Sequence, residues 1–293
     1  MFRFIILFMV MALSRFSSSG QAPFPYPDIP DSLTTPQKRI EYLAVRFWDK
    51  VDFANTTVLD SSKPVLDFLY LINNARAAVV ETAFSRLLEL ACGNQDSLDK
   101  LIYWFSHFLH DSNSPLYDDS LYAEFLKAFL SSGAPEETKD GMRCPYEVVS
   151  RNQIGEVAED FSFTDKSGEL QTLHGIDSPY ILLIFTNPEC SLCRAAESRL
   201  GALQALRDLQ QRSKLRILAI CPGQDRDAWL THDYPSGWIS GYDDSGVIRD
   251  KRLYEIQYYP CFYILDSEKK VLLKEGGLEQ TEKFLTSLED ENQ

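Results

Sequence analysis

The sequence predicts two domains: an all-α helical bundle followed by an α/β domain that opens with a β-hairpin. Three observations lead to this fold class. Apolar residues recur at helical spacing between residues 35 and 132, and no strand-like alternation of any length interrupts them. Turn formers and charged residues then fill the stretch 131–155. Beyond it, short apolar runs typical of strands alternate with helical patterns. We therefore place a helical domain at 31–145 and an α/β domain at 150–293.

The first residues have the features of a cleavable secretory signal peptide. Arg3 supplies a positive charge, and the apolar run from Phe4 to Leu13 is too short to span a bilayer comfortably. Small residues then lead to a cleavage site before Gln21. No cysteine follows the apolar run, so a lipid anchor is not expected; the alternative is an uncleaved membrane anchor. We expect residues 1–20 to be removed and the mature protein to lie in the periplasm.

The helical half follows a proline-rich, extended lead-in over 23–34. Its first helix is predicted to begin at Pro36, with Thr35 as the N-cap. A second clear helix opens with Asp96 as its cap and carries a wide apolar stripe. A further helix is expected through 121–130, and the whole half is predicted to be a bundle of about five helices.

Aromatic side chains and two histidines stand out in this bundle. His107 and His110 lie three residues apart on one helix, a spacing that a metal pair could use, but no acidic or cysteine partner is evident. We interpret both as partly exposed helix residues and predict no metal site. Four aromatic residues are interpreted as core rather than as a ligand site: Trp48, Phe53, Tyr103 and Trp104.

The α/β half is predicted to run in the order hairpin, strand, helix, strand, helix, strand, strand, helix. The hairpin turns at Lys166-Ser167-Gly168, and the continuous apolar run 178–185 suits a buried central strand. The remaining elements are a helix at 194–212, a strand at 214–220, a short helix at 225–232, an antiparallel pair at 260–266 and 269–275, and a closing helix at 278–289.

Two cysteines spaced C-x-x-C, Cys190 and Cys193, follow the central strand and open a helix. The spacing alone fits a redox disulfide, half of a zinc site or two inert cysteines. Zinc needs two further ligands, whereas the other cysteines are isolated and the histidines are scattered. In an exported protein the pair is more often redox-active than metal-binding. A helix N-terminus favours a thiolate, so Cys190 is predicted to be the exposed nucleophile and Cys193 the cysteine that resolves the mixed disulfide. No cofactor is expected.

A proline just before an apolar strand is the second unusual feature. Pro260 cannot donate a hydrogen bond to a strand ladder. A cis peptide bond between Tyr259 and Pro260 would leave the backbone of Tyr259 free to pair with an incoming peptide beside Cys190. The alternative is a trans proline that enters an edge strand. We assign Tyr259 and Pro260 to substrate binding.

Residues 153–290 resemble the thioredoxin fold, specifically its extracytoplasmic TlpA/ResA-like branch. The matching stretches are "GEVAEDFSFTDKSGELQTL", "ILLIFTNPECSLC" and "WISGYDDSGVIRDKRLYEIQYYPCFYILDSEKKVLLKE". Residues 31–135 are similar to a helical domain of uncharacterised function that precedes such domains in bacterial envelope proteins. The resemblance implies a thioredoxin-like fold for 150–293 and a redox-active disulfide between Cys190 and Cys193.

The resemblance also implies a function. It predicts a thiol–disulfide oxidoreductase of the bacterial envelope, with a part in redox homeostasis, that exchanges the Cys190–Cys193 disulfide with cysteines of partner proteins. A membrane thiol–disulfide electron donor or acceptor would reset the pair. The alternative is a non-catalytic binding or scaffold protein with a degenerate thioredoxin-like domain. Whether targets are reduced or oxidised stays open.

Five features depart from the pattern of this branch: Glu189 in place of the usual tryptophan, Ser191-Leu192 in place of Gly-Pro, Ile184 in place of a buried acid, Ala196 in place of a glutamate, and Cys261 in place of the threonine after the proline. The carboxylate of Glu189 is expected to oppose a Cys190 thiolate. Since both acids are missing and Glu197 lies one position from the second, the group that exchanges a proton with Cys193 is unassigned.

Peroxidase activity of the peroxiredoxin type is not expected. Peroxiredoxins place Thr or Ser three residues before their reactive cysteine and Pro seven before it. Those positions are Asn187 and Leu183 before Cys190, and Cys190 and Thr186 before Cys193, so neither cysteine fits.

Composition supports a folded protein that does not bind nucleic acid. The 293 residues are 44% hydrophobic and 12% aromatic, enough to bury a substantial core. A net charge of -14 argues against nucleic acid as a partner, because nucleic acid attracts basic patches.

Cys221 and Cys261 are each predicted near a strand end beside the C-x-x-C pair. Either is a candidate third thiol, but we interpret both as small buried hydrophobes.

Overall fold

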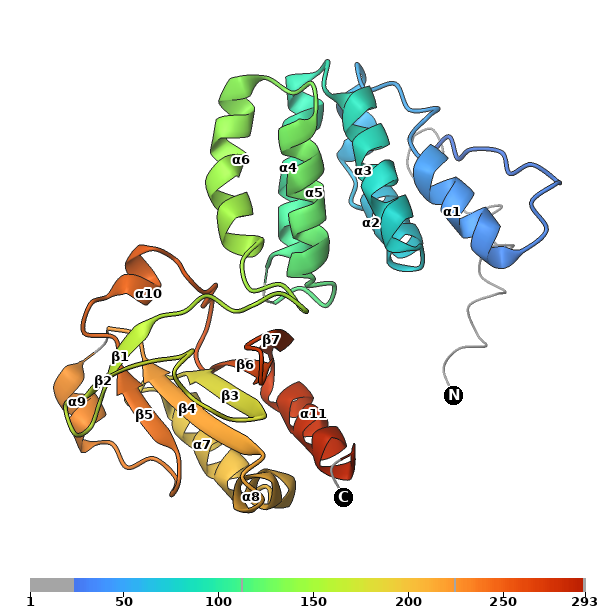
Figure 1. The fold of residues 1–293 in the computed structure, drawn as a ribbon. Coiled ribbons are helices and arrows are strands. Elements are labelled where there is room, and N and C mark those ends of the chain that lie inside the picture. Colours follow the sequence, from blue (N-terminus) through green and yellow to red (C-terminus); the bar gives the residue numbers. More distant parts are fainter. Residues whose placement is uncertain (1–23, 112, 224, 292–293) are drawn as a thin grey trace.

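The computed structural model describes residues 24–291 except 112 and 224. The predicted signal peptide, residues 1–20, lies outside the described residues. Within these residues, six α-helices and one 3-10 helix come first, and a seven-stranded sheet with five α-helices follows. Figure 1 shows the helices of the first domain side by side above the sheet of the second, so the predicted fold class is confirmed. Within the described part of the chain, no helix is long and apolar enough to cross a bilayer.

The helical domain contains α1 Pro36–Arg46, η2 Thr56–Leu59, α2 Lys63–Asn73, α3 Ala77–Ala91, α4 Gln95–Leu109, α5 Asp119–Ser131 and α6 Glu136–Val149. The start of α1 is as predicted, because the Thr35 side chain accepts a backbone N–H of the first turn and Pro36 follows it. The predicted cap of α4 is wrong. Asn94 caps that helix by accepting the N–H of Ser97, and Asp96 lies inside the first turn.

Aromatic rings fill the core of this domain. A chain of ring contacts runs through its centre: Phe47, Phe68, Phe84, Phe105 and Phe125. Trp48 and Phe53 are buried against it, as predicted. Tyr103 is 59% exposed, and Trp104 lies at the edge of the core with its indole N–H donated to the carbonyl of Leu59. The prediction of four core aromatics is therefore wrong for Tyr103.

The stretch predicted to be rich in turns folds mostly as α6. Glutamates in its first turn suit the helix dipole, and Glu136 pairs with Lys139 and Arg143 at 3.1 Å each. Pro145 leaves one helical hydrogen bond unmade without ending the helix. In the described part of the helical domain there are thus six α-helices rather than about five, and the last of them continues to Val149.

The sheet of the α/β domain has the strand order β2-β1-β5-β4-β3-β6-β7. Its strands are β1 Ser162–Asp165, β2 Leu170–Thr172, β3 Tyr180–Phe185, β4 Leu215–Cys221, β5 Ile239–Tyr242, β6 Cys261–Asp266 and β7 Val271–Gly276. β3 lies between β4, which is parallel to it, and β6, which is antiparallel. The predicted hairpin, central strand and final antiparallel pair are all present.

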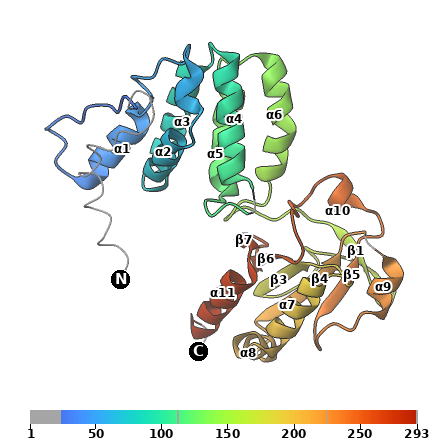
Figure 2. The same cartoon turned by 180° about the vertical axis from the view of Figure 1, so that it is seen from behind.

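Helices cover both faces of this sheet. The helices are α7 Ser191–Ala202, α8 Gln204–Gln211, α9 Arg226–Thr231, α10 Val247–Asp250 and α11 Leu278–Glu291. Leu200, Leu206 and Leu285 belong to one buried cluster with residues of the central strands. They come from α7, α8 and α11, which Figure 2 shows from behind. On the other face, Ile248 of α10 and Tyr254 pack against β3 and β6.

Two details differ from the prediction. The helix expected at 194–212 is divided into α7 and α8, because Leu203 has an extended backbone. Strand β5 was not predicted, since it is only four residues long and contains a glycine. Gly241 is required there: a Cβ atom would lie 2.4 Å from the Phe163 ring and 2.6 Å from Ile220.

Candidate active site

Cys190 is the N-cap residue of α7, directly after the loop that leaves β3. Its sulfur accepts the backbone N–H of Cys193 at 3.4 Å. The Cys190 side chain is partly exposed, whereas Cys193 is fully buried one turn inside the helix. Both cysteines are thiols in this structure. The geometry therefore exposes the first sulfur and shields the second.

The pKa values of the two thiols are shifted in opposite directions. Partial burial opposes ionisation of Cys190, but hydrogen bonds from Cys193 and Leu192 and the charge of Arg194 outweigh it and lower the pKa of the Cys190 thiol below its usual value. Arg194 is held nearby by a hydrogen bond to the carbonyl of Pro188 at 2.7 Å. Burial raises the pKa of Cys193 to about 12. Glu189, which was expected to oppose the thiolate, is exposed to solvent, so water screens its charge.

This difference predicts the labelling pattern of the reduced protein. Iodoacetamide is expected to modify Cys190 first, with a pH midpoint below that of an ordinary thiol, because only thiolates react. Cys193 is expected to stay unmodified up to high pH. The measurement is the rate at each cysteine against pH by peptide mass spectrometry. Equal rates at the two sites, or faster modification of Cys193, would contradict the assignment of Cys190 as nucleophile.

The segment before β6 faces Cys190. The Tyr259–Pro260 peptide bond is cis, and the carbonyl oxygen of Tyr259 lies 3.9 Å from the sulfur of Cys190. Because β6 lies between β3 and β7, the proline does not enter an edge strand. The structure thus brings together the four residues that the sequence singled out: Cys190, Cys193, Tyr259 and Pro260.

Three polar residues near Cys193, Thr186, Glu197 and His232, form a hydrogen-bonded group that was not assigned from the sequence. The hydroxyl of Thr186, which is itself fully buried, acts on the Cys193 thiol and lowers its pKa against the larger effect of burial. Thr186 donates its hydroxyl proton to the Oε1 atom of Glu197 at 2.7 Å. The Oε2 atom of Glu197 contacts His232 Nε2, also at 2.7 Å, and the Glu197 side chain is only 5% exposed.

One signal in the sequence points to part of this group. Glu197 follows Cys193 by four residues, and residues at that spacing lie on the same face of a helix. His232 comes from the end of α9, and no local pattern connects it with the C-x-x-C pair. Helix α7 therefore supplies a buried carboxylate, Glu197, although the two positions that usually carry an acid hold Ile184 and Ala196.

Cys221 and Cys261 are both buried, with exposed fractions of 0% and 1%. Cys221 ends β4, and Cys261 begins β6 beside Phe185 of the central strand. Burial raises the pKa of Cys261 well above its usual value, which keeps it as a thiol. Their surroundings agree with the interpretation of both as small hydrophobes.

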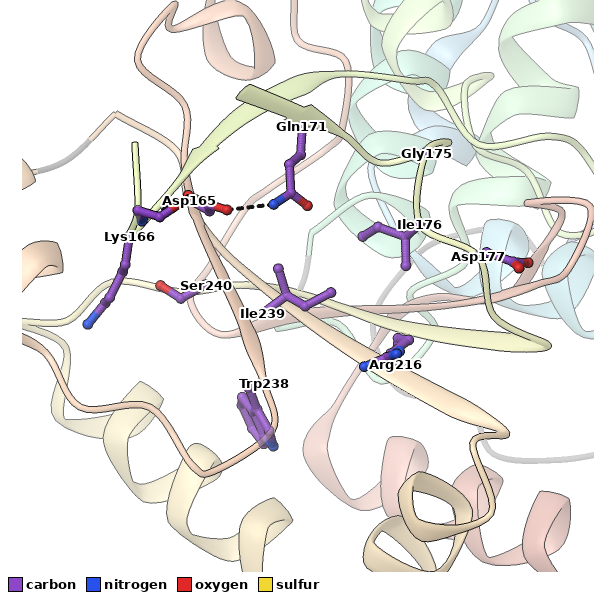
Figure 3. A pocket seen from close by; sticks show the side chains of 11 residues that line it. Asp165, Lys166, Gln171, Gly175, Ile176, Asp177, Arg216, Trp238, Ile239 and Ser240 are labelled. Atoms are coloured by element: carbon purple, nitrogen blue, oxygen red, sulfur yellow. Dashed lines mark hydrogen bonds between the residues drawn. The ribbon is translucent and has the colours of Figure 1, made fainter. Parts of the chain in front are cut away.

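A shallow pocket in this domain lies far from the cysteines. Asp165 of β1, Arg216 of β4 and Trp238, just before β5, are among the residues that line it (Figure 3). Arg216 is the second residue of β4, whereas Cys190 follows the last residue of the parallel strand β3. The two sites are therefore at opposite ends of the sheet, and we assign the pocket no role.

Comparisons with known proteins agree with this two-part architecture. Residues 11–152 match the family described as "Domain of unknown function (DUF5106)". A solved structure of a thioredoxin-like protein from Bacteroides caccae is 28% identical, and the match covers 92% of this chain and 99% of that chain with a TM-score of 0.82. The C-terminal domain of an uncharacterized protein from Bacteroides fragilis is 35% identical, with 46% of this chain and 98% of that one covered and a TM-score of 0.45.

Some of the similar solved structures carry names that include an activity. The thioredoxin domain of a thiol-disulfide oxidoreductase from Bacteroides vulgatus is 20% identical over 46% of this chain and 97% of its own, with a TM-score of 0.41. No curated protein matches the chain. Residues 11–152 therefore match the DUF5106 family, and the α/β domain that follows has the thioredoxin-like fold.

Proposed function

We propose that this protein is a thiol–disulfide oxidoreductase of the bacterial envelope that exchanges a Cys190–Cys193 disulfide with cysteines of partner proteins. The observation that carries the proposal is the position of Cys190 at the N-terminus of α7, where hydrogen bonds and Arg194 favour its thiolate while the Tyr259 carbonyl faces its sulfur at 3.9 Å. An inert cysteine pair needs neither feature. A scaffold protein without turnover is the alternative that the experiment below distinguishes.

In the reducing direction, the Cys190 thiolate attacks one sulfur of a partner disulfide. That S–S bond breaks, and the other partner sulfur, which was not attacked, leaves as a thiolate that takes up a proton. The attacked sulfur is now bound to Cys190 in a mixed disulfide. Cys193 then loses its proton and attacks the sulfur of Cys190 in the mixed disulfide. The second partner thiolate leaves, so the partner gains two electrons and the protein keeps a Cys190–Cys193 disulfide. The same steps in reverse oxidise a partner dithiol.

The second step needs a proton acceptor, because burial raises the pKa of Cys193 to about 12. We infer that Glu197 accepts this proton through the Thr186 hydroxyl. Thr186 can take the thiol proton on its oxygen as it donates its own proton to Glu197. His232 holds the other carboxylate oxygen and fixes the orientation of the side chain.

Redox titration tests the activity against the scaffold alternative. The Cys190–Cys193 pair is expected to form and break reversibly in glutathione buffers, at a potential between about -120 and -270 mV, where known exchangers lie. The fraction of oxidised protein is measured by mass after alkylation at each potential. A pair that stays locked or unreactive through this range would identify a non-catalytic domain.

The cellular location is proposed from the N-terminal sequence alone. The short apolar run without a nearby cysteine predicts export and cleavage before Gln21. Fractionation of cells followed by intact-mass measurement is expected to find a periplasmic species that begins at Gln21. A full-length species in the membrane fraction would contradict the cleavage. A membrane thiol–disulfide protein that resets the pair is the partner we propose.

A further inference from the structure

The helical domain contacts the segment that precedes the cis-proline. The side-chain amide of Gln257 donates a hydrogen bond to the carbonyl oxygen of His110 at 3.1 Å. His110 is the C-cap residue of α4. Figure 1 shows the ends of α4 and α5 just above β6 and β7, which are the strands next to this segment. The loop that faces Cys190 is thus held in part by a residue outside its own domain.

A buried polar cluster joins the two domains at the same place. Tyr117, just before α5, donates its hydroxyl proton to the carboxylate of Glu275 on β7. Tyr263 of β6 donates to the other oxygen of this carboxylate at 2.8 Å. Lys274 donates to the carbonyl of Val149 at 2.9 Å, so β7 also holds the end of α6.

Asp119 connects α5 to this cluster from the helical side. Its Oδ1 atom lies 2.7 Å from His110 Nδ1, and its Oδ2 atom lies 4.0 Å from the ammonium group of Lys274. The side chains of Asp119, Lys274 and Glu275 are each no more than 6% exposed. Burial and the charge of Asp119 raise the pKa of Glu275 to about 7. Buried charges are costly to separate from their partners, so these contacts favour one placement of α5 on β7.

The cluster leads back to the reacting sulfur. Tyr258 donates its hydroxyl proton to the backbone carbonyl of Glu275 at 3.1 Å. The next residue is Tyr259, whose carbonyl faces the sulfur of Cys190. Gln257 and Tyr258 are therefore anchored two residues and one residue before Tyr259, the residue proposed to pair with a bound peptide. The anchor of Gln257 is a residue of the helical domain. The anchor of Tyr258 is the backbone of Glu275, whose side chain accepts from Tyr117 of the helical domain.

We propose that the helical domain positions the substrate-binding loop 255–261, through the contact of Gln257 with His110 and through the Glu275 cluster that holds Tyr258. This proposal rests on the proposed exchange activity. It gives the domain of unknown function a role, since it supports recognition of protein disulfides without touching the reacting atoms. A misplacement of about 1 Å is enough to slow a reaction by about 10²-fold, so a modest shift of this loop is measurable.

Two variants test the proposal in the full chain. Gln257→Leu removes the amide that reaches His110, and Tyr117→Phe removes the hydroxyl that reaches Glu275. Both are expected to raise KM for insulin disulfides about tenfold with little change in kcat, because the loop binds the polypeptide but takes no part in the chemistry. Reaction of Cys190 with a small disulfide, which needs no backbone pairing, is expected to be unchanged.

Ser120→Ala is the matched control. Ser120 also lies at the domain junction, but its hydroxyl bonds to Gln153 of the linker at 2.6 Å rather than to the loop. It is expected to behave as the wild type. Hydrogen exchange gives a second readout that does not depend on activity: backbone amides of 255–261 are expected to exchange faster in Gln257→Leu and Tyr117→Phe only.

The outcomes separate the two proposals. If the wild type reduces no disulfide, the proposed function fails, and hydrogen exchange still decides whether the helical domain orders the loop. If the wild type is active but both variants keep its KM and its exchange pattern, the positioning role is overturned. Should Tyr117→Phe fail to fold, Gln257→Leu decides alone, because the Gln257 side chain is on the surface.

Discussion

Cys190→Ser is expected to abolish the reduction of insulin disulfides, because the first bond to a substrate sulfur forms at Cys190. Cys193→Ser is expected to retain that first step and to accumulate a mixed disulfide that no second thiol resolves. The measurements are the initial rate with a dithiol donor in excess and the mass of the trapped species. A Cys190→Ser protein that keeps its rate would show that the mechanism is wrong outright.

The remaining cysteines of this domain provide the control. Cys221→Ser combined with Cys261→Ala is expected to leave the insulin rate nearly intact, because both side chains are buried and play no part in the proposed steps. Circular dichroism checks that the double variant is folded. If it is folded but has lost most of its activity, a third thiol takes part in the exchange.

Much of the fold could be predicted because its strongest patterns are local. The run Tyr180–Phe185 is apolar throughout, as a strand buried on both faces requires. Helix α6 was missed because Gly141 and Pro145 resemble turn signals, while the charge pairs that support the helix lie three or more residues apart. Strand β5 was missed because its place depends on packing of Gly241 against Phe163 and Ile220, which no local pattern reveals.

The residues of the candidate site likewise fall into those that a local motif predicts and those that meet only in the folded protein. Cys190, Cys193 and Pro260 are visible in the sequence because each belongs to a short motif with a physical reason. The partners of Cys193 are not, since Thr186 and His232 come from different elements and meet only in the folded domain. The contact of Gln257 with His110 joins residues 147 positions apart and depends on how two domains meet.

Glu197 also changes how the departures from the thioredoxin pattern are understood. The positions that usually carry an acid hold Ile184 and Ala196, and the first of these is buried in the apolar core between the sheet and α7. The next position of α7 carries a carboxylate, Glu197, and the Thr186 hydroxyl lies between this carboxylate and the Cys193 thiol. The loss of the usual acids therefore does not by itself make the pair inert.

Glu197→Gln is expected to slow resolution of the mixed disulfide by about 10²-fold, the lower end of what a positioned proton acceptor contributes. The glutamine side chain has nearly the same shape, and its oxygen can still accept from Thr186, but it cannot take up a proton. Thr186→Val is expected to give a similar loss, because it removes the hydroxyl that connects Cys193 to the carboxylate. Attack by Cys190 is expected to be unchanged in both variants.

An aromatic disulfide that releases a coloured thiolate separates the two steps in a stopped-flow experiment. The first release reports attack by Cys190, and the second reports resolution by Cys193. Glu189→Gln is the control, since it removes a carboxylate that is exposed and adjacent to Cys190 rather than buried behind Cys193. The difference in resolution rate between the wild type and Glu197→Gln is expected to become smaller as the pH rises towards about 12, because Cys193 then ionises without a proton acceptor. If the second release is as fast in Glu197→Gln as in the wild type, Glu197 is not the proton acceptor.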